Sequence, residues 1–356
     1  MYEAWNQFKS WYRVLPKLAA AVLAVFGLIV VFADFIAPYD LGTQSRNEPN
    51  APAASLHFRH DGELRFLSPY VHPLKLADPL ERRYEEDTTR KFSLGFFVDG
   101  EPYRFIGLIP MQTRLFGVRV ADDGAPRVNL LGTDSLGRDR FSRLLFAIRF
   151  SLIVCPPGVL MAWLIGLTVG TVSGYSGRWP DTVLMGIADT MLALPTLILI
   201  LTARAAFPLD LPPTRAAILL VLIFSLTGWA EVARLARGLV LSLKEREFVL
   251  AARATGLTEA RILVRHILPN AMPTLLTQAS VMLPYFLLAE VALSFLGVGV
   301  QEPQPSLGNM LAAAADVNRL SREPLLVLAP GLVIFIFVAA VRMAGPSRNG
   351  STPPIR

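Results

Sequence analysis

The sequence is short of charge, because Lys, Arg, Asp and Glu make up only 17% of its 356 residues, whereas a soluble domain usually carries about 25%. Its single cysteine, Cys155, excludes an internal disulfide and any metal site built from several cysteines. Cys155 lies in an apolar run, so we expect it to be buried. The chain lacks a Gly-x₄-Gly-Lys-[Ser/Thr] motif and is not expected to bind ATP itself. No Ser–His or paired-Asp constellation indicates a catalytic residue.

Apolar residues are abundant instead, with 53% hydrophobic residues and a mean hydropathy of +0.46. A helix needs roughly 20 apolar residues to cross about 30 Å of hydrocarbon. Six runs meet this length, and we expect an all-α polytopic membrane protein with helices near residues 17–37, 151–173, 181–206, 214–236, 273–297 and 323–343. The first run has no small-residue cleavage pattern after it, so we interpret it as a retained anchor.

Lys and Arg gather at the N-terminus, at Arg178, in the 234–265 loop and in the tail. The positive-inside rule therefore predicts that both termini and this loop are cytoplasmic, and that residues 38–150 lie outside. The net charge of +6 follows from this distribution, and no nucleic-acid partner is expected.

Residues 44–130 are expected to form a β-rich extracytoplasmic insertion between the first two helices. Alternating apolar and polar residues predict strands near 56–59, 92–98 and 103–109. We also expect a linker at 47–52, a helical turn within 79–88, and turns at Asp61-Gly62, Asp99-Gly100 and Asp123-Gly124.

Three of the four histidines, His57, His60 and His72, lie in this insertion. Their spacing matches no standard metal site, so the sequence predicts no metal site and assigns them solvated or structural roles.

Residues 131–150 predict an amphipathic segment at the outer surface, before the second span. A polar turn comes first, and a helix follows with an apolar stripe at Leu144, Leu145 and Ile148 and with Arg140, Arg143 and Arg149 for interfacial contacts. Two interpretations stay open: a plain interfacial anchor, or a lip over an outer mouth where a delivery protein docks. The residues of the candidate lip are Gly132, Asp134, Gly137, Arg138 and Asp139.

Small residues and prolines mark the predicted bundle. Gly166, Gly170 and Gly174 recur every four residues, which favours close approach of a neighbouring helix. Pro195 and Pro284 lie inside apolar runs and are each expected to kink a helix.

Acidic residues inside spans are costly unless they face protein or water. Asp189 and Glu290 are such residues, and they are predicted either to line a pathway or to bridge helices. Glu231 and Arg234 have the spacing of a helical ion pair.

The 243–268 segment between the fourth and fifth spans predicts a helix, a turn at Gly256 and a second short helix. We expect Thr258 to cap the second helix and Pro269 to end it. The small side chains of Ala251 and Ala252 would allow this element to enter a groove of a partner, with arginines at the rim.

This segment resembles the EAA loop of ABC importer permeases, whose pattern is Glu-Ala-Ala, three residues, Gly and then Ile-x-Leu-Pro. Leu250 replaces the Glu and His266 replaces the first Ile, as in the oligopeptide/dipeptide branch. Residues 131–145, 174–181, 293–301 and 305–311 resemble the C-type subunit of that branch, and nickel permeases share these motifs. The resemblance implies that the segment couples to an ATPase through Glu247, Ala251, Ala252, Arg253, Gly256, Arg261, His266 and Pro269.

The resemblance further implies the six-helix type I ABC importer permease fold in a bacterial cytoplasmic membrane. The expected partners are a homologous permease, forming a heterodimer, two ATPase subunits and an external substrate-binding protein. ATP and Mg²⁺ would be bound by the ATPases, and no cofactor by this chain. The expected parts are residues 1–43, the insertion at 44–130, the segment at 131–150, a permease core at 147–343 and a cytoplasmic tail at 344–356.

Peptides are the expected substrates. The alternatives are nickel or another small solute, or a membrane anchor or sensor outside the ABC class. A secondary transporter would need inverted repeats, and the sequence shows none.

Overall fold

The computed structural model describes residues 2–60, 63–64, 69–78, 83–118, 126–313 and 324–344. The chain divides into two compact units. We call residues 1–24, 152–300 and 334–356 the helical unit, and residues 25–151 and 301–333 the insertion unit.

Five helical stretches in the described residues are long and apolar enough to cross a membrane: Lys17–Ile36, Arg140–Tyr175, Pro213–Leu243, Glu259–Phe295 and Val327–Ala344. They belong to α1 (Tyr2–Ile36), α2 (Arg140–Tyr175), α5 (Pro213–Leu243), α8 (Leu268–Phe295) with the short helices before it, and α11 (Leu325–Ala344). A sixth span results if α3 (Arg178–Ala193) and α4 (Thr196–Ala205) are counted together.

Pro195 lies in the break between α3 and α4, where the chain bends by 87°. A proline cannot donate the backbone hydrogen bond that would continue α3, so the predicted kink at Pro195 is confirmed. Pro284 lies inside the continuous helix α8.

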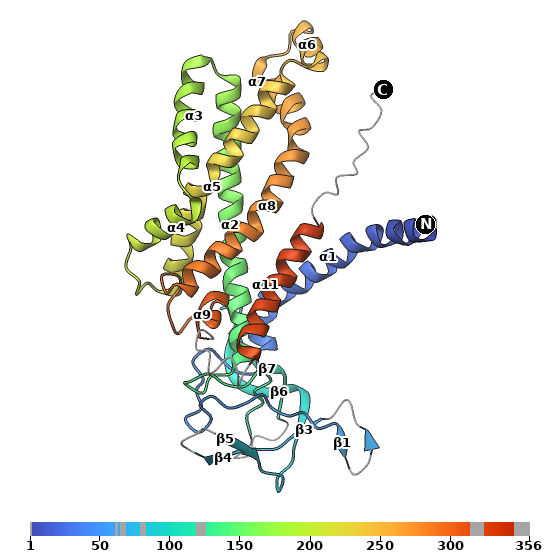
Figure 1. Ribbon diagram of the computed structural model, residues 1–356, viewed down its shortest axis with the longest axis vertical. Coiled ribbons are helices and arrows are strands. Elements are labelled where there is room, and N and C mark those ends of the chain that lie inside the picture. The colour runs from blue at the N-terminus through green and yellow to red at the C-terminus, as the bar shows by residue number, and fades with distance from the viewer. Residues whose placement is uncertain are drawn as a thin grey trace. The chain divides into compact units, whose positions relative to one another are not determined.

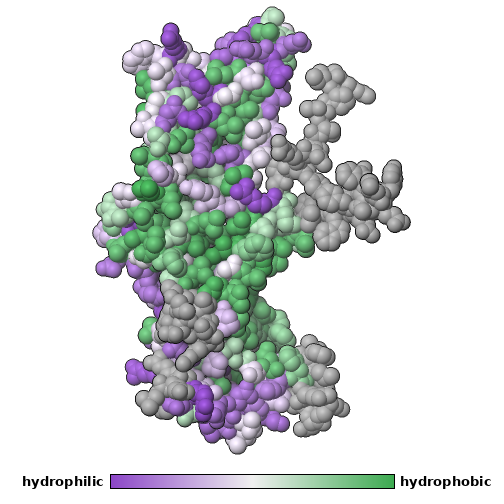
Figure 2. Space-filling view, in the orientation of Figure 1, coloured by the Kyte–Doolittle hydropathy of each residue, from purple (hydrophilic) through white to green (hydrophobic). Residues whose placement is uncertain are grey.

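Within the helical unit, α5 packs against α3, α4 and α8 (Figure 1). One contact cluster joins Met185 and Ala188 of α3 to Trp229 and Ala233 of α5. Figure 2 shows hydrophobic side chains gathered over these helices, and hydrophilic ones toward the end that carries α6 and α7. An apolar outer surface is what lipid contact requires, while the packing between the helices depends on close side-chain and backbone contact.

The three regularly spaced glycines of α2 face α5. A Cβ atom on Gly166 would lie 2.5 Å from the carbonyl oxygen of Trp229, and one on Gly170 would lie 2.2 Å from that of Ala233. Both distances are too short for a real Cβ contact, so α2 and α5 meet backbone to backbone. The close helix packing predicted from the spacing is confirmed.

The insertion unit contains three small antiparallel sheets. β1 (Arg59–His60) pairs with β2 (Glu63–Leu64), and β4 (Leu74–Asp78) pairs with β5 (Arg83–Glu86). In the third sheet, β6 (Phe92–Phe105) lies between β3 (Tyr70–Val71) and β7 (Ile109–Val118). Val71, Leu94 and Val128 form the core beneath this sheet. The short helix α9 (Leu307–Ala312) begins with a capping box made by Ser306 and Asn309.

Arg114 of β7 is buried and binds the C-terminal end of α1. Its guanidinium donates to the carbonyl oxygens of Asp34 at 2.7 Å and Ala37 at 3.0 Å. These carbonyls lack partners within the helix, and a cation is favoured at a helix C-terminus. The ring of Tyr103 stacks on the other side, 4.3 Å from the guanidinium carbon.

Several local expectations for the insertion are wrong. Asp99-Gly100 lies within β6 at an irregularity of the ladder, and the hairpin turns instead at Ile106 and Gly107, which both have positive φ. Residues 83–86 form a strand, not part of a helical turn. The turns expected at Asp61-Gly62 and Asp123-Gly124 lie outside the described residues.

The expected break between an amphipathic helix and the second span is also absent. Residues 140–175 form one helix of 36 residues, which at 1.5 Å per residue is about 54 Å long. This length exceeds the roughly 30 Å of a hydrocarbon core. The polar first turns and the apolar span after them therefore belong to one continuous helix. Cys155 is fully buried within it, as predicted.

The α2–α5 contact generates a stability prediction. Gly170→Leu drives a side chain into the backbone of α5 and is expected to destabilise the protein by about 3 kcal/mol or more, the upper range for overpacking. Thermal unfolding of the purified protein in detergent measures the effect. The matched control is Gly186→Leu in α3, where nothing lies within 4 Å of the added Cβ. Equal melting temperatures for the two variants would contradict the backbone contact.

Candidate functional site

The first candidate site is the segment between α5 and α8, which we call the coupling segment (residues 243–268). Helix α6 (Glu247–Ala254) begins after the extended residue Arg246. The chain turns at Gly256, whose φ of +77° is open to glycine and strained for most other residues. Helix α7 (Glu259–Ile262) follows Thr258, which takes the N-cap position without a side-chain hydrogen bond.

The second helix of this segment does not end at Pro269. A π-helical stretch, η1 (Leu263–Ile267), leads from α7 directly into α8, and Pro269 lies in the first turn of α8. The expected role of Pro269 as a stop signal is therefore wrong.

One face of the coupling segment packs on its own chain. Val249 and Ala252 of α6 and Ile262 and Ile267 beyond the turn form a buried cluster with Val240 of α5. Ala252 is only 7% exposed, so it supports this internal packing rather than presenting itself to a groove of a partner.

The other face is exposed and partly apolar. Phe248, Leu250 and Val264 are 40%, 52% and 64% exposed. Exposed apolar side chains at the polar end of a membrane bundle indicate a surface for a protein partner. Of the residues predicted for coupling, Glu247, Ala251, Arg253, Gly256, Arg261 and Pro269 are exposed, and His266 is half-buried.

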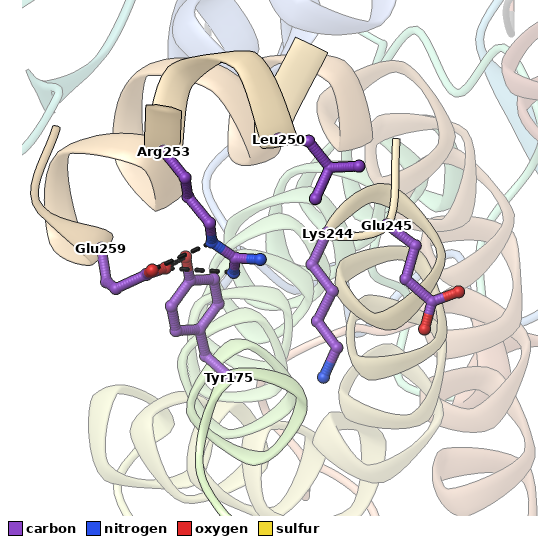
Figure 3. A pocket seen from close by; sticks show the side chains of 6 residues that line it. All are labelled: Tyr175, Lys244, Glu245, Leu250, Arg253 and Glu259. Atoms are coloured by element: carbon purple, nitrogen blue, oxygen red, sulfur yellow. Dashed lines mark hydrogen bonds and ion pairs between the residues drawn. The ribbon is translucent and has the colours of Figure 1, made fainter. Parts of the chain in front are cut away.

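Polar contacts fasten this segment to the end of α2. Arg253 donates to both carboxylate oxygens of Glu259, at 2.9 and 3.2 Å, and the hydroxyl of Tyr175 donates to the same carboxylate. Figure 3 shows the three side chains converging, while Glu245 points away. The hydrogen bond with Glu259 is the largest cause that raises the pKa of Arg253. These groups line an open cleft of about 530 Å³ together with Lys244, Glu245 and Leu250.

The same end of the bundle holds a second set of contacts. Arg237 of α5 donates to Asp181 of α3 at 2.6 Å, and Ser173 of α2 donates to the same carboxylate. Lys244 donates to the carbonyl oxygen of Gly174 at 3.3 Å. The ends of α2, α3 and α5 are thus joined to each other and to the coupling segment. Tyr175 and Asp181 lie far from the motif in the chain, so the pattern of its consecutive residues does not indicate them as part of this site.

The second candidate site is the loop of residues 132–139, which the sequence analysis treats as a lip. Asp134 organises it: its side chain accepts from the N–H groups of Leu136 and Arg138, both at 2.9 Å, and from Nε of Arg138 at 2.7 Å. Gly137 has a φ of +70°, and a Cβ there would overlap the carbonyl oxygen of Ser45. The loop is therefore built into the insertion unit.

The first residues of the insertion are fixed to this loop. Ser45 donates its N–H to Gly137, Asn50 donates to Asp134, and Ala51 and Thr133 exchange hydrogen bonds. Residues 47–52 are therefore not a free linker. Gly132 also has a positive φ and lies against Ala51.

The arginines in and after the loop are withdrawn from solvent, and Arg138, Arg143 and Arg149 pair with carboxylates. Glu302 receives hydrogen bonds from Arg138 and Arg143, both at 2.7 Å. Arg140 and Arg143 are only 8% and 5% exposed, so they are not the interfacial side chains that the sequence predicts. Arg149 meets Asp34 at 2.7 Å.

Asp139 caps α2 and is almost fully buried. One carboxylate oxygen accepts from the backbone N–H and the hydroxyl of Ser142, both at 2.7 Å, which is the geometry of an N-cap. Burial is the main cause that raises the pKa of Asp139 from 3.8 to about 6, against the hydrogen bonds from Ser142 that lower it.

The intramembrane acids differ in their surroundings. Glu290 is fully buried and accepts from Ser294 of the same helix, α8, at 2.9 Å, so this contact bridges no helices and the role of Glu290 stays a prediction. The Asp189 side chain is 59% exposed and pairs with Arg234. Arg234 therefore pairs with Asp189 in place of the expected Glu231.

Glu231 has a different partner, because it accepts from Gln278 at 3.2 Å. It lines a cavity of about 210 Å³ among α4, α5, α8 and α11, with Thr227, Tyr285 and Arg342. The sequence pattern does not indicate Glu231 as a pathway residue.

A family model described as the binding-protein-dependent transport system inner membrane component matches residues 166–344. The dipeptide transport system permease protein DppC of Alkalihalophilus pseudofirmus is 35% identical over 223 residues, which cover 63% of this chain and 71% of the relative. The oligopeptide transport system permease protein OppC of Bacillus subtilis is 32% identical over 237 residues, covering 66% and 75%.

Among solved structures, an inward-facing methionine ABC transporter, MetNI, matches with 19% identity and a TM-score of 0.43. The match covers 57% of this chain and 94% of that chain.

The buried cap Asp139 generates a pH prediction. A raised pKa in the folded protein means that Asp139 contributes most to stability below pH 3.8, and that this contribution is lost as the pH rises to about 6. Asp139→Asn keeps the cap uncharged and is expected to become more stable than the wild type over this range, by about 2 kcal/mol at pH 7. Thermal unfolding between pH 4 and 7 tests this. A constant difference between the two proteins across that range would refute the assignment.

Proposed function

The chain belongs to the family of binding-protein-dependent transport system inner membrane components, and we propose that it is the peptide-carrying permease subunit of an ATP-driven importer. Relatives named as dipeptide and oligopeptide permeases support the substrate class. The proposed mechanism rests on one observation. One face of the coupling segment is packed on the bundle, and the other face exposes apolar side chains. A permease of this family works with an ATPase and a substrate-binding protein and is itself a non-catalytic pore subunit.

The assembly that we propose contains a homologous permease as heterodimer partner, two ATPase subunits that bind ATP and Mg²⁺, and an external substrate-binding protein. The chain has six spans of the type I importer fold in a bacterial cytoplasmic membrane. Both termini and the coupling segment lie in the cytoplasm, and the insertion at 44–130 lies outside. This topology rests on the distribution of Lys and Arg.

The coupling segment transmits the movement of the ATPase. An ATPase subunit binds the exposed side chains of Phe248 and Leu250. The Arg253–Glu259–Tyr175 contacts carry a displacement of the segment to α2, because they fix α7 to the end of that helix. Coupling of this kind needs two states of the bundle that the nucleotide biases differently.

Within the spans, we assign the pathway to the cavity lined by Glu231, Thr227, Tyr285 and Arg342. Polar and charged groups in a membrane bundle are favoured where they face water or each other. Movement of α2 against α5 changes the packing of the helix that carries Glu231 and Thr227. The loop at 132–139 stays the proposed docking lip for the binding protein through its exposed residues Ser135 and Leu136, since the five residues first assigned to the lip are buried or half-buried.

Peptide uptake tests this function. Cells that need an externally supplied amino acid are expected to grow on a tripeptide containing it only when this chain is present. The Gly256→Val variant is expected to reduce uptake at least tenfold, because a β-branched residue at φ +77° costs of order 1–3 kcal/mol and displaces the turn. Uptake of radiolabelled tripeptide by whole cells gives the rate.

Gly256→Asn is the matched control, since Asn tolerates this backbone conformation and a Cβ at Gly256 meets nothing within 4 Å. It is expected to retain most of the uptake. Unchanged peptide uptake in cells lacking the chain, together with lost uptake of nickel, would assign the transporter to the metal ion instead.

Membrane topology is tested with single cysteines in a Cys155→Ser background. Leu108→Cys places a thiol at the exposed tip between β6 and β7, where Leu108 is 80% exposed. It is expected to react with a membrane-impermeant maleimide in intact spheroplasts. Leu250→Cys is expected to react only after lysis, and its labelling in intact spheroplasts would reverse the proposed orientation.

A further inference from the structure

The insertion unit brings together two histidines and a glutamate that are well separated in the sequence. His57, His72 and Glu86 each offer one ligand atom, and these atoms all lie within 4.8 Å of one another. All three residues are half-buried. The spacing of the histidines along the chain alone predicts no metal site. The side chain of His60 lies outside the described part of the structure.

Strand pairing positions the three groups. The backbones of His57 and Tyr70 exchange two hydrogen bonds of 2.9 Å, which aligns the segment before β1 with β3. Glu86 ends β5, where it pairs with Leu74 at the start of β4. His72 lies in the connection from β3 to β4. Three separate segments therefore meet at one place.

The orientation of both rings is fixed. The ring of His57 stacks on that of Tyr70, with centroids 5.1 Å apart, and the ring of His72 lies edge-on to both. Nδ1 of His72 is 2.7 Å from the carbonyl oxygen of Arg90. A carbonyl only accepts, so Nδ1 carries the proton, and Nε2 of the neutral ring keeps its lone pair for a ligand. A histidine held in this way by its second nitrogen is the usual form of a metal ligand.

The carboxylate of Glu86 is already held next to His57, and it also accepts a hydrogen bond from the side chain of Ser55. Nε2 of His57 and Oε2 of Glu86 are 3.1 Å apart. Two ligands about 2.0–2.1 Å from a tetrahedral ion are about 3.3–3.4 Å apart, so this pair needs little movement to hold an ion.

We propose that His57, His72 and Glu86 form a binding site for one divalent transition-metal ion of the zinc type. Two imidazoles and one carboxylate suit Zn²⁺, and three protein ligands leave a fourth position for water or for a group from another molecule. The ion replaces the proton on Nε2 of His57 and joins the three segments. Lys75, the cation nearest along β4, is neutralised by Asp87 at 2.7 Å.

Zinc titration of the full-length protein tests the site. The protein is purified in detergent with an affinity tag free of histidine, treated with a chelator, and titrated with Zn²⁺ against a chromophoric competitor. The wild type is expected to bind one ion per chain and to melt at a higher temperature with zinc, because an ion that binds only the folded state stabilises it. His57→Ala, His72→Ala and Glu86→Gln are each expected to weaken binding at least tenfold.

Glu85→Gln is the matched control. Glu85 precedes Glu86 in β5 and therefore points to the opposite face of the strand. Its side chain is 65% exposed and pairs with Arg83, so this variant is expected to bind zinc like the wild type. Melting temperatures measured without zinc show whether each variant is folded.

Three results would overturn the proposal: a wild type that binds no zinc, zinc binding retained by the folded His57→Ala and His72→Ala variants, or equal losses in Glu85→Gln and Glu86→Gln. Loss of zinc binding in the three ligand variants alone would establish the site. Peptide uptake is not the readout, so failure of this proposal leaves the assignment as a permease untouched.

Discussion

The structure of the helical unit depends on the approach of α2 to α5 at backbone distance. Gly166 and Gly170 leave no room for a Cβ atom between the two helices. An apolar side chain gains little free energy by moving from lipid into a helix interface. Close contact between the helix surfaces, rather than the hydrophobic effect, therefore drives helix association in the membrane. Polar contacts at one end of the bundle add to it, because Arg237 binds Asp181 of α3 and Lys244 binds the carbonyl of Gly174 in α2.

The sequence predicted features that depend on a local pattern. The glycine spacing, the kink at Pro195 and the burial of Cys155 follow from periodicity or from the chemistry of one residue. The errors arise where long-range contacts override a local signal. Asp99-Gly100 is a favourable sequence for a β-turn. The pairing of β6 with β7 nevertheless continues beyond these two residues, and the turn forms at Gly107.

The candidate sites show the same limit more strongly. The motif in the coupling segment is readable from consecutive residues, whereas Tyr175 and Asp181 join it only through folding. In the same way, His57, His72 and Glu86 meet because β-strand pairing brings three segments together. Arg143 was expected at an interface because charge normally seeks water, but Glu302 follows it by more than 150 residues and neutralises it. No pattern within one segment contains that information.

Neighbouring residues of the coupling segment have opposite tasks. Ala252 faces Val240 and the buried cluster, while Ala251, one position earlier, is exposed. A helix turns by 100° per residue, so a motif written as two adjacent alanines necessarily combines an internal and an external requirement. The internal one is burial, because Ala252 belongs to the cluster with Val240, Ile262 and Ile267. The external one applies to the exposed face, which also carries Phe248 and Leu250. The motif is therefore better understood as two constraints on one short helix than as a single recognition sequence. In the proposed coupling, a push on the outer face reaches α5 through the buried contact with Val240.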